Sequence, residues 1–327
     1  ALGDGRAMIF SGNGRDCMTT DVAEMYTPGA GLNVMPGAQA FLNLFPRMHL
    51  LTSGLIAHVG EESFTSTYDP GNDQWEFIGF NIHGWRSQGT SILVPGETDV
   101  IMIIGGYDEV GARNTCEIID FKQADPLWQK AGSMNFPRAH ANTVILPDKK
   151  VMIIGGGNED LYGLPELTPE MYDPASDTWT TLPSHVHARM YHSTALLLPD
   201  GRVVSAGQDS GESAFMTEIY SPPYLFRGSR PTVTSLPDRI GYGQSFTIGV
   251  DDSSTITEVC LIRPSVVTHS VNFEQRYIEL DLEVTGPRTM RLTAPPGGNH
   301  APPGPYMLFA LSSDGVPSIA EFTTLGE

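Results

Sequence analysis

One pattern that recurs about every fifty residues constrains the fold of this chain more than any other feature. The sequence YDPGNDQW at 68–75 matches YDPASDTW at 172–179, and VIMIIGG at 100–106 matches VMIIGG at 151–156. Weaker copies bring the number of repeats to about five, each with strand-like runs that end near a Tyr or Asp. Several short strands per repeat, separated by turns, are typical of a kelch-type β-propeller.

The two ends of the repeat region, residues 1–227, are irregular. The first repeat shows only the end of an inner strand, ALGDGRAMIFSG at 1–12, and the last has no clear outer strand after Phe226. A closed propeller needs a complete set of strands in each blade. We therefore expect either a fragment or processed form that lacks one or two N-terminal blades, or a five-bladed ring with an irregular closure.

The character of the sequence changes at about residue 228. Residues 228–327 contain about seven short strand-like runs separated by turn residues, and the repeat motif does not recur there. This pattern predicts an immunoglobulin-like β-sandwich. The expected fold is therefore all-β, with a kelch-type β-propeller at 1–227 followed by an immunoglobulin-like β-sandwich at 228–327.

Composition excludes several classes of function. Asp and Glu number 38 against 19 Lys and Arg, which gives a net charge of −19. A nucleic-acid partner needs a basic surface, so we expect none. No apolar run approaches about 18 residues, so we expect no membrane span. The three cysteines have no tight spacing, which argues against a structural zinc site.

Few residues of the repeat region are candidates for chemistry. No HExxH motif, nucleophile elbow or phosphate-binding loop occurs. Trp75 and Trp179 are expected to pack between blades and not to bind a cofactor. An Arg-x-His pattern occurs at 47–49 and 138–140, and a longer version, RMYH, at 189–192. Each stands near the head of an inner strand, where it forms either a hydrogen-bonded structural group or part of a histidine-lined channel.

Four ordered motifs resemble the galactose oxidase and glyoxal oxidase family of copper radical oxidases. RMYHSTALLLPDGRVVSAG at 189–207 resembles the last-blade motif of that family, and EIYSPPYLF at 218–226 resembles its exit from the propeller. THSVNFEQR at 268–276 and the segment APPGPYMLF at 301–309 resemble two stretches of its C-terminal domain. The resemblance covers nearly the whole chain and implies an early-set immunoglobulin-like domain at its end.

The resemblance implies a mononuclear copper site with one Cu²⁺ per chain. The family's ligands map to Tyr191, His192 and His269, the last of them on a hairpin of the sandwich that reaches into the propeller pore. Imidazole and oxygen ligands suit Cu(II), and Tyr191 would also act as the base for a substrate hydroxyl. Neighbouring strand residues point to opposite faces, so Tyr191 and His192 can share a metal only if the strand is irregular or begins there.

The family's remaining ligand is a tyrosine that is cross-linked to a cysteine and carries a radical. This pair is not found here, because Cys17, Cys116 and Cys260 do not stand in the family's sequence context. The expected function is oxidation of a primary alcohol or an aldehyde, carbohydrates included, by O₂ to give H₂O₂, with the radical half not present in this chain. The alternatives are a non-catalytic propeller that binds a carbohydrate or a protein, and a structural kelch scaffold. The family also implies secretion.

Overall fold

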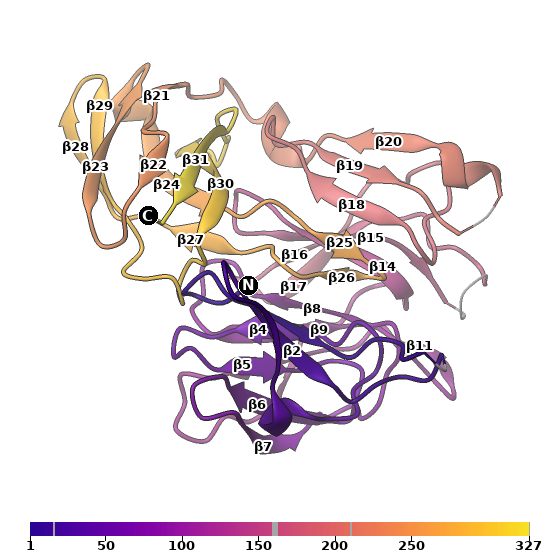
Figure 1. Ribbon diagram of the computed structural model, residues 1–327. Helices are drawn as coiled ribbons and strands as arrows, with labels where there is room; N and C mark the ends of the chain where they lie inside the picture. Colours follow the sequence, from indigo (N-terminus) through magenta and orange to yellow (C-terminus); the bar gives the residue numbers. More distant parts are fainter. Residues whose placement is uncertain (16, 159–162, 210, 327) are drawn as a thin grey trace.

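The computed structural model describes residues 1–15, 17–158, 163–209 and 211–326, and in this part of the chain it is built almost entirely of strands (Figure 1). The predicted all-β fold is confirmed. The helical segments are short 3₁₀ turns: η1 (Pro36–Ala38), η2 (Glu212–Phe215), η3 (Pro223–Phe226) and η4 (Ser253–Thr255). No helix among these residues is long and apolar enough to span a membrane.

The repeats fold into successive antiparallel sheets in which strands that are consecutive along the chain pair with one another. Their strands, sheet by sheet in the described part of the chain, are β1 (Ala7–Phe10), β2 (Ala23–Thr27), β3 (Gly31–Val34); β4 (Met48–Leu50), β5 (Ile56–His58), β6 (Phe64–Asp69), β7 (Gln74–Phe80); β8 (Thr90–Leu93), β9 (Val100–Ile104), β12 (Cys116–Asp120), β13 (Gln129–Ala131); β14 (Ala139–Ile145), β15 (Val151–Gly157), β16 (Glu170–Asp173), β17 (Thr178–Thr181); and β18 (Thr194–Leu197), β19 (Val203–Ala206), β20 (Thr217–Tyr220). A small hairpin, β10 (Tyr107–Asp108) and β11 (Gly111–Ala112), projects from the third of these sheets.

The YDP…D-x-W motif of the repeat joins neighbouring sheets. The Tyr172 hydroxyl donates to Asp177 Oδ1 at 2.8 Å, which fixes the turn between β16 and β17. Trp179 Nε1 then donates at 2.8 Å to the carbonyl of Gly132, just after β13 of the preceding sheet. The copy at 68–75 makes the same contacts, with Trp75 bonded to the carbonyl of Ala38 at 3.1 Å. The prediction that these tryptophans pack between blades is confirmed.

A buried ion pair recurs in the third, fourth and fifth sheets. An arginine just before the first strand pairs with a glutamate on the third strand of the same sheet, and backbone N–H groups of the preceding loop donate to that glutamate. A buried charge is tolerated only when it is paired and hydrogen-bonded, so each pair ties the segment before the first strand of its sheet to the third strand. The pairs are Arg86–Glu117, Arg138–Glu170 and Arg189–Glu218.

The C-terminal part is a two-sheet sandwich. One sheet is β21 (Val233–Ser235), β23 (Ser245–Val250), β29 (Thr289–Thr293), β28 (Leu282–Gly286); the other is β22 (Arg239–Ile240), β31 (Glu321–Leu325), β30 (Gly304–Ser312), β24 (Ile256–Ile262), β27 (Tyr277–Glu279). Alternate residues such as Ile248, Leu261, Met290 and Leu308 fill the core between them. The expected division at 227/228 falls in the segment that connects β20 to β21.

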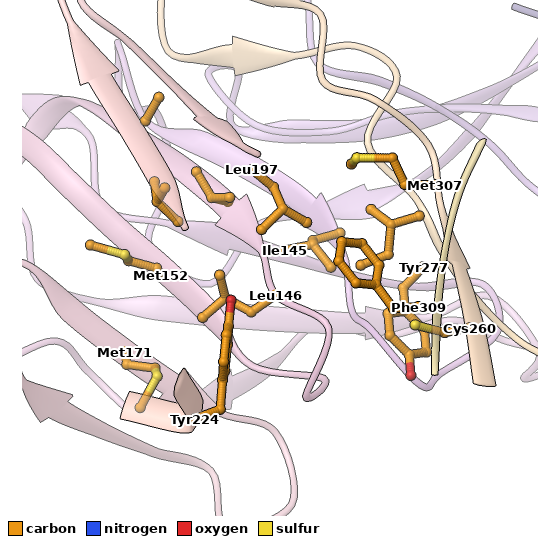
Figure 2. Packing of buried hydrophobic residues seen from close by; sticks show 14 of the residues in the cluster. Ile145, Leu146, Met152, Met171, Leu197, Tyr224, Cys260, Tyr277, Met307 and Phe309 are labelled. Atoms are coloured by element: carbon orange, nitrogen blue, oxygen red, sulfur yellow. The ribbon is translucent and has the colours of Figure 1, made fainter. Parts of the chain in front are cut away.

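The sandwich also packs against the last two sheets of the repeat region. Figure 2 shows Met307, Phe309 and Cys260 of the sandwich facing Ile145 and Leu197, which come from β14 and β18. All five side chains are buried. This shared core holds the sandwich in a fixed position over the inner strands, which is what lets it contribute to a site there.

Candidate metal centre

A hairpin of the sandwich, β25 (Val267–Thr268) and β26 (Val271–Asn272), extends to the innermost strands of the repeat sheets. It contacts β18, β14 and β8, and Figure 1 shows it reaching out from the sandwich toward these strands. His269 stands at its tip. The hairpin therefore carries a side chain of the C-terminal domain into the middle of the sheets.

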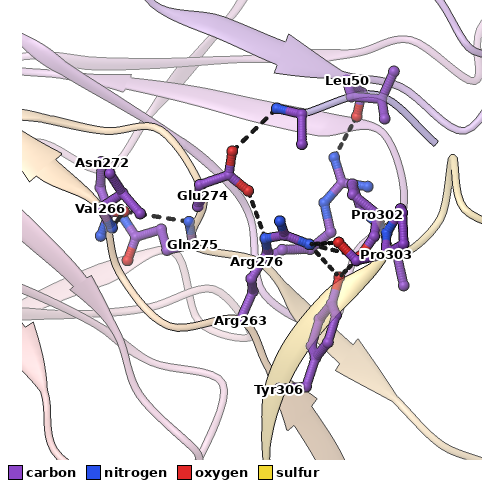
Figure 3. A network of polar contacts seen from close by, with 12 residues as sticks. Leu50, Arg263, Val266, Asn272, Glu274, Gln275, Arg276, Pro302, Pro303 and Tyr306 are labelled. Carbon is purple, nitrogen blue, oxygen red and sulfur yellow. Dashed lines mark hydrogen bonds and ion pairs between the residues drawn. The ribbon is translucent and has the colours of Figure 1, made fainter. Parts of the chain in front are cut away.

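The residues that follow the hairpin hold it in place. The Gln275 amide bonds to β14 twice, accepting from Ile145 N at 3.0 Å and donating to the Thr143 carbonyl at 3.1 Å. Arg276 donates to the Leu50 carbonyl, a bond that Figure 3 shows, and also to backbone carbonyls of the 299–300 loop. The EQR part of the THSVNFEQR motif is thus an anchor.

Tyr191, His192 and His269 come together at the hairpin tip. His192 Nε2 lies 2.9 Å from His269 Nε2, although the two residues are 77 positions apart. The Tyr191 ring stacks on the His192 ring with centroids 3.8 Å apart, and its edge meets the His269 ring at 5.4 Å. The three residues predicted from the motifs are thus neighbours in space, while their role as ligands stays a prediction.

The backbone at these residues explains how Tyr191 and His192 can turn to one place. The strand β18 begins only at Thr194, so strand alternation does not apply to the Tyr-His pair. His192 has a φ of 64°, and His269 and Ser270 have φ values of 50° and 65°. Left-handed backbone is unfavourable for residues other than glycine and occurs in tight turns as well as at functional sites.

Each histidine has a partner for its second ring nitrogen. His192 Nδ1 lies 2.9 Å from Asp209 Oδ1, and His269 Nδ1 lies 2.6 Å from the Thr268 hydroxyl. The Phe45 ring stacks on His269 with centroids 3.6 Å apart and an interplanar angle of 12°. Asp209 therefore holds the His192 ring, and Thr268 and Phe45 hold the His269 ring. The Nε2 atoms of both histidines remain directed at each other.

The surroundings of His269 favour its neutral form. Burial lowers its pKa, and the nearby His192, Arg47 and His140 lower it further because positive charges repel a proton there. A neutral imidazole keeps a lone pair free on one nitrogen. It is the form that binds metal ions.

The residues fit a copper ion. Two imidazole nitrogens bound in neighbouring positions at the usual distance of about 2.0–2.1 Å lie about 2.9 Å apart. The two Nε2 atoms have this separation, which is also that of an ordinary hydrogen bond. Square-planar or tetragonal sites of nitrogen and oxygen ligands are typical of Cu(II). Two imidazoles and a phenol are such a ligand set.

Sequence reasoning missed two neighbours of this cluster and left the role of a third open. Phe45 and Asp209 belong to no motif and enter only through the fold. His140, which the sequence left open between a structural and a channel role, meets the Tyr191 ring edge at 5.4 Å. His49, from the other Arg-x-His copy, instead bonds to Ser91 at 2.7 Å, and burial lowers its pKa to about 3.

Comparisons with known proteins agree with this arrangement. Two family models match: "Glyoxal oxidase N-terminus" over residues 84–223 and "Galactose oxidase-like, Early set domain" over residues 230–325. The chain belongs to the galactose oxidase and glyoxal oxidase family. Tyr191, His192 and His269 lie within these matches, whereas the first two repeat sheets, before residue 84, lie outside them.

Three relatives illustrate the family. An aldehyde oxidase GLOX of Vitis pseudoreticulata is 31% identical over 86% of this chain and 62% of its own length. A galactose oxidase of Gibberella zeae is 32% identical over 71% of this chain and 37% of its own. A solved structure described as a novel fungal alcohol oxidase in complex with copper superposes with a TM-score of 0.90, at 26% identity, over all of this chain and 74% of that one.

This family member spans less than two thirds of the length of those two curated relatives. Its three cysteines are free: Cys17 is exposed, and Cys116 and Cys260 are buried in two different hydrophobic clusters. The aromatic neighbours described for Tyr191 are histidines.

Proposed function

We propose that this chain carries the copper-binding half of an oxidase that converts a primary alcohol or an aldehyde with O₂ into the oxidised product and H₂O₂. Tyr191, His192 and His269 hold one Cu²⁺ per chain. The 2.9 Å separation of the two Nε2 atoms carries this proposal, because it brings together residues from two parts of the fold. The family match and the copper-bound structural relative support it.

Each residue has a defined task in this proposal. His192 and His269 present unprotonated Nε2 atoms to the ion. The Tyr191 phenolate oxygen accepts the proton of the substrate hydroxyl, which leaves an alkoxide that is easier to oxidise. When bound, copper supplies a one-electron redox couple and a Lewis-acidic position for the substrate oxygen.

The electron balance asks for one more group. Oxidation of an alcohol to an aldehyde releases two electrons and two protons, and reduction of O₂ to H₂O₂ consumes both. One copper ion exchanges one electron, so a second one-electron group takes part. In the family that group is a tyrosine cross-linked to cysteine, and we propose that it comes from outside the residues described here. Secretion, and small alcohols, aldehydes or carbohydrates as substrates, are further parts of the proposal.

A titration of the metal-free chain with Cu(II), followed by electron paramagnetic resonance, tests the metal site. We expect one copper per chain with nitrogen hyperfine structure that is lost in His269→Ala. A matched variant, His83→Ala, removes a histidine in the loop after β7 and should leave the spectrum unchanged. Copper that binds equally well to His269→Ala would contradict the proposed ligand set.

A non-catalytic role is the second candidate, and it is favoured by the sequence context of Cys17, Cys116 and Cys260, none of which matches the cross-linked cysteine of the family. In this case the histidine cluster remains from an oxidase ancestor and the propeller binds a carbohydrate or a protein. The copper titration and a peroxide assay together distinguish the two. H₂O₂ formed with a primary alcohol or an aldehyde supports the oxidase, and a chain that binds no copper at His192 and His269 supports the binding module. Absence of H₂O₂ alone favours neither, because the radical group is proposed to come from outside the described residues.

A further inference from the structure

Asp209 lies beside the candidate centre and belongs to none of the motifs that identify it. The strand β19 ends at Ala206, and Gly207, with a φ of 74°, turns the chain back over the head of β18. This turn brings Asp209 Oδ1 to 2.9 Å from His192 Nδ1. The His192 side chain is 41% exposed and that of Asp209 is 33% exposed, so the contact lies at the edge of the site.

The chemistry of a carboxylate determines which nitrogen of His192 carries the proton. A neutral imidazole has one N–H and one lone pair, and an ionised carboxylate only accepts hydrogen bonds. The proton of His192 is therefore on Nδ1, where it donates to Asp209. The lone pair on His192 Nε2 then faces His269.

His269 is held differently. Its Nδ1 partner is the Thr268 hydroxyl, which can donate or accept and so does not select a tautomer. The two Nε2 atoms are 2.9 Å apart, and a His192 Nε2 that only accepts requires His269 Nε2–H to be the donor of this contact. Only His269 has to change its tautomer for both Nε2 atoms to bind one ion.

We propose that Asp209 is a positioning residue, which fixes His192 in the Nδ1–H tautomer and so prepares its Nε2 for the metal. The consequence for metal affinity rests on the proposed function, while the tautomer itself does not. Carboxylates that bond to the far nitrogen of a ligand histidine orient the ring and increase its basicity. Asp209→Ala should therefore lower copper affinity about 10- to 100-fold.

The first test is made without metal. Long-range ¹⁵N–¹H spectra at pH 8, where an ordinary imidazole is neutral, report which ring nitrogen of each histidine is protonated. The His192 signals are assigned by their loss in His192→Ala. We expect His192 in the Nδ1–H form in the wild type and in Asp209→Asn, which keeps an acceptor oxygen. In Asp209→Ala we expect a shift toward the Nε2–H form.

The second test is a Cu(II) titration of the same variants. Affinity should fall most in Asp209→Ala and less in Asp209→Asn. Glu212→Ala is the matched control, because it removes an exposed carboxylate three residues further along the same loop and should change neither the tautomer nor the affinity.

Two results would overturn the inference. One is a His192 tautomer in Asp209→Ala that equals that of the wild type. The other is a loss of affinity in Glu212→Ala as large as that in Asp209→Ala, since it would mean that only the net charge of the loop matters. If the wild type binds no copper, the proposed function fails, and the metal-free tautomer comparison still decides for or against Asp209.

Discussion

Two aspartates occupy the same position of the repeat and experience opposite environments. Asp148 and Asp200 both follow Leu-Pro in the turn between the first two strands of their sheets. Both carboxylate oxygens of Asp148 are shielded from solvent without a hydrogen-bond partner among the described residues. Burial raises the pKa of Asp148 to about 6, despite the opposing effect of nearby Lys150 and Arg227.

The environment of Asp200 acts the other way. Partial burial alone would raise its pKa, but hydrogen bonds from the Arg202 side chain and backbone outweigh that effect and lower it. The ionised form of Asp200 therefore stabilises the fold, whereas the ionised form of Asp148 destabilises it.

We expect opposite effects of removing these two charges. Asp148→Asn should raise the free energy of unfolding at pH 7 by about 1–3 kcal/mol, because the folded state no longer ionises a carboxyl whose pKa it raises. A raised carboxyl pKa contributes stability below the unfolded value near 3.8, and this contribution is lost as the pH rises toward 6. Most of the gain should therefore be absent at pH 4.

Asp200→Asn is the matched control for this comparison. It should lower the free energy of unfolding at pH 7 by no more than about 1 kcal/mol, since its ion pair is partly exposed. Urea unfolding at pH 7 and pH 4 measures both variants. If the two variants changed stability in the same direction at pH 7, the assigned environments would be wrong.

At the level of single residues, the sequence predicted the part of the centre that local motifs carry. Tyr191, His192 and His269 stand in motifs, and the structure brings them together. Phe45 and Asp209 lie in other loops and contact His269 and His192. They stand in no recognisable motif, so the sequence alone does not predict these contacts. The sequence also carries a signal that was missed: a glutamate recurs two residues before the Tyr or Ile near the end of the third strand. Each of these glutamates, Glu117, Glu170 and Glu218, pairs with an arginine before the first strand of its sheet.

At the level of strands and sheets, neighbouring repeat sheets are in contact where the backbone after the last strand of one sheet lies close to a turn of the next sheet. Gly132 follows β13, and a Cβ atom added there would lie 2.2 Å from the Asp177 carbonyl oxygen in the next sheet. Gly37, after the last strand of the first sheet, has the same relation to Asp73 of the second sheet. Because the obstructing atom belongs to the backbone, a neighbouring side chain cannot relieve the clash by moving.

Gly132→Ala should therefore destabilise the protein by about 2 kcal/mol or more, the range expected of overpacking. Gly79→Ala is the control, because Gly79 lies within the strand β7 and a Cβ atom there meets nothing within 4 Å. We expect that control to change stability by less than about 0.5 kcal/mol. Denaturant unfolding measures both, and a neutral Gly132→Ala would mean that the sheets are less closely packed than described.

The position of the hairpin β25–β26 depends on the Gln275 side chain, which forms two hydrogen bonds with the backbone of β14. Gln275 is 7% exposed, and its amide supplies both the acceptor and the donor that β14 would otherwise receive from a neighbouring backbone. Gln275→Ala leaves a buried N–H and a buried carbonyl unpaired, which should cost about 2–4 kcal/mol.

The same variant should also weaken copper binding, because His269 loses the anchor that holds its hairpin against β14. Gln275→Glu retains the acceptor for Ile145 N and should lose less affinity than Gln275→Ala. The measurements are urea unfolding and a Cu(II) titration. Unchanged copper affinity in Gln275→Ala would mean that Arg276 alone positions the hairpin.

The longer strands with a clear apolar pattern could be predicted from the sequence, and the shortest strands could not. The apolar inner strands, such as 100–104 and 151–157, and the turns between them were evident from the sequence. The hairpin was expected from family resemblance only, because strands of two residues have no periodicity to read. The start of β18 after His192 depends on left-handed backbone, which the sequence does not reveal at a non-glycine residue.

On the scale of the whole molecule, the centre lies where two separately built parts meet. His192 comes from the head of the fifth repeat sheet and His269 from the sandwich, and the two parts also share one hydrophobic cluster. An ion bound by both histidines would link the two parts directly. Copper binding and the stability of the whole chain should therefore be coupled, because a ligand that binds only the folded state stabilises it.

We expect copper at 100 times its dissociation constant to add about 2.7 kcal/mol to the free energy of unfolding. For a chain of this size this corresponds to a rise in the unfolding temperature of about 4 °C. The chelator EDTA should reverse the rise, His269→Ala should abolish it, and His83→Ala should retain it. Differential scanning calorimetry measures the shift and also shows whether the parts unfold together. If copper raised the unfolding temperature of His269→Ala as much as that of the wild type, the ion would not be bridging the two parts, and the proposed centre would be wrong.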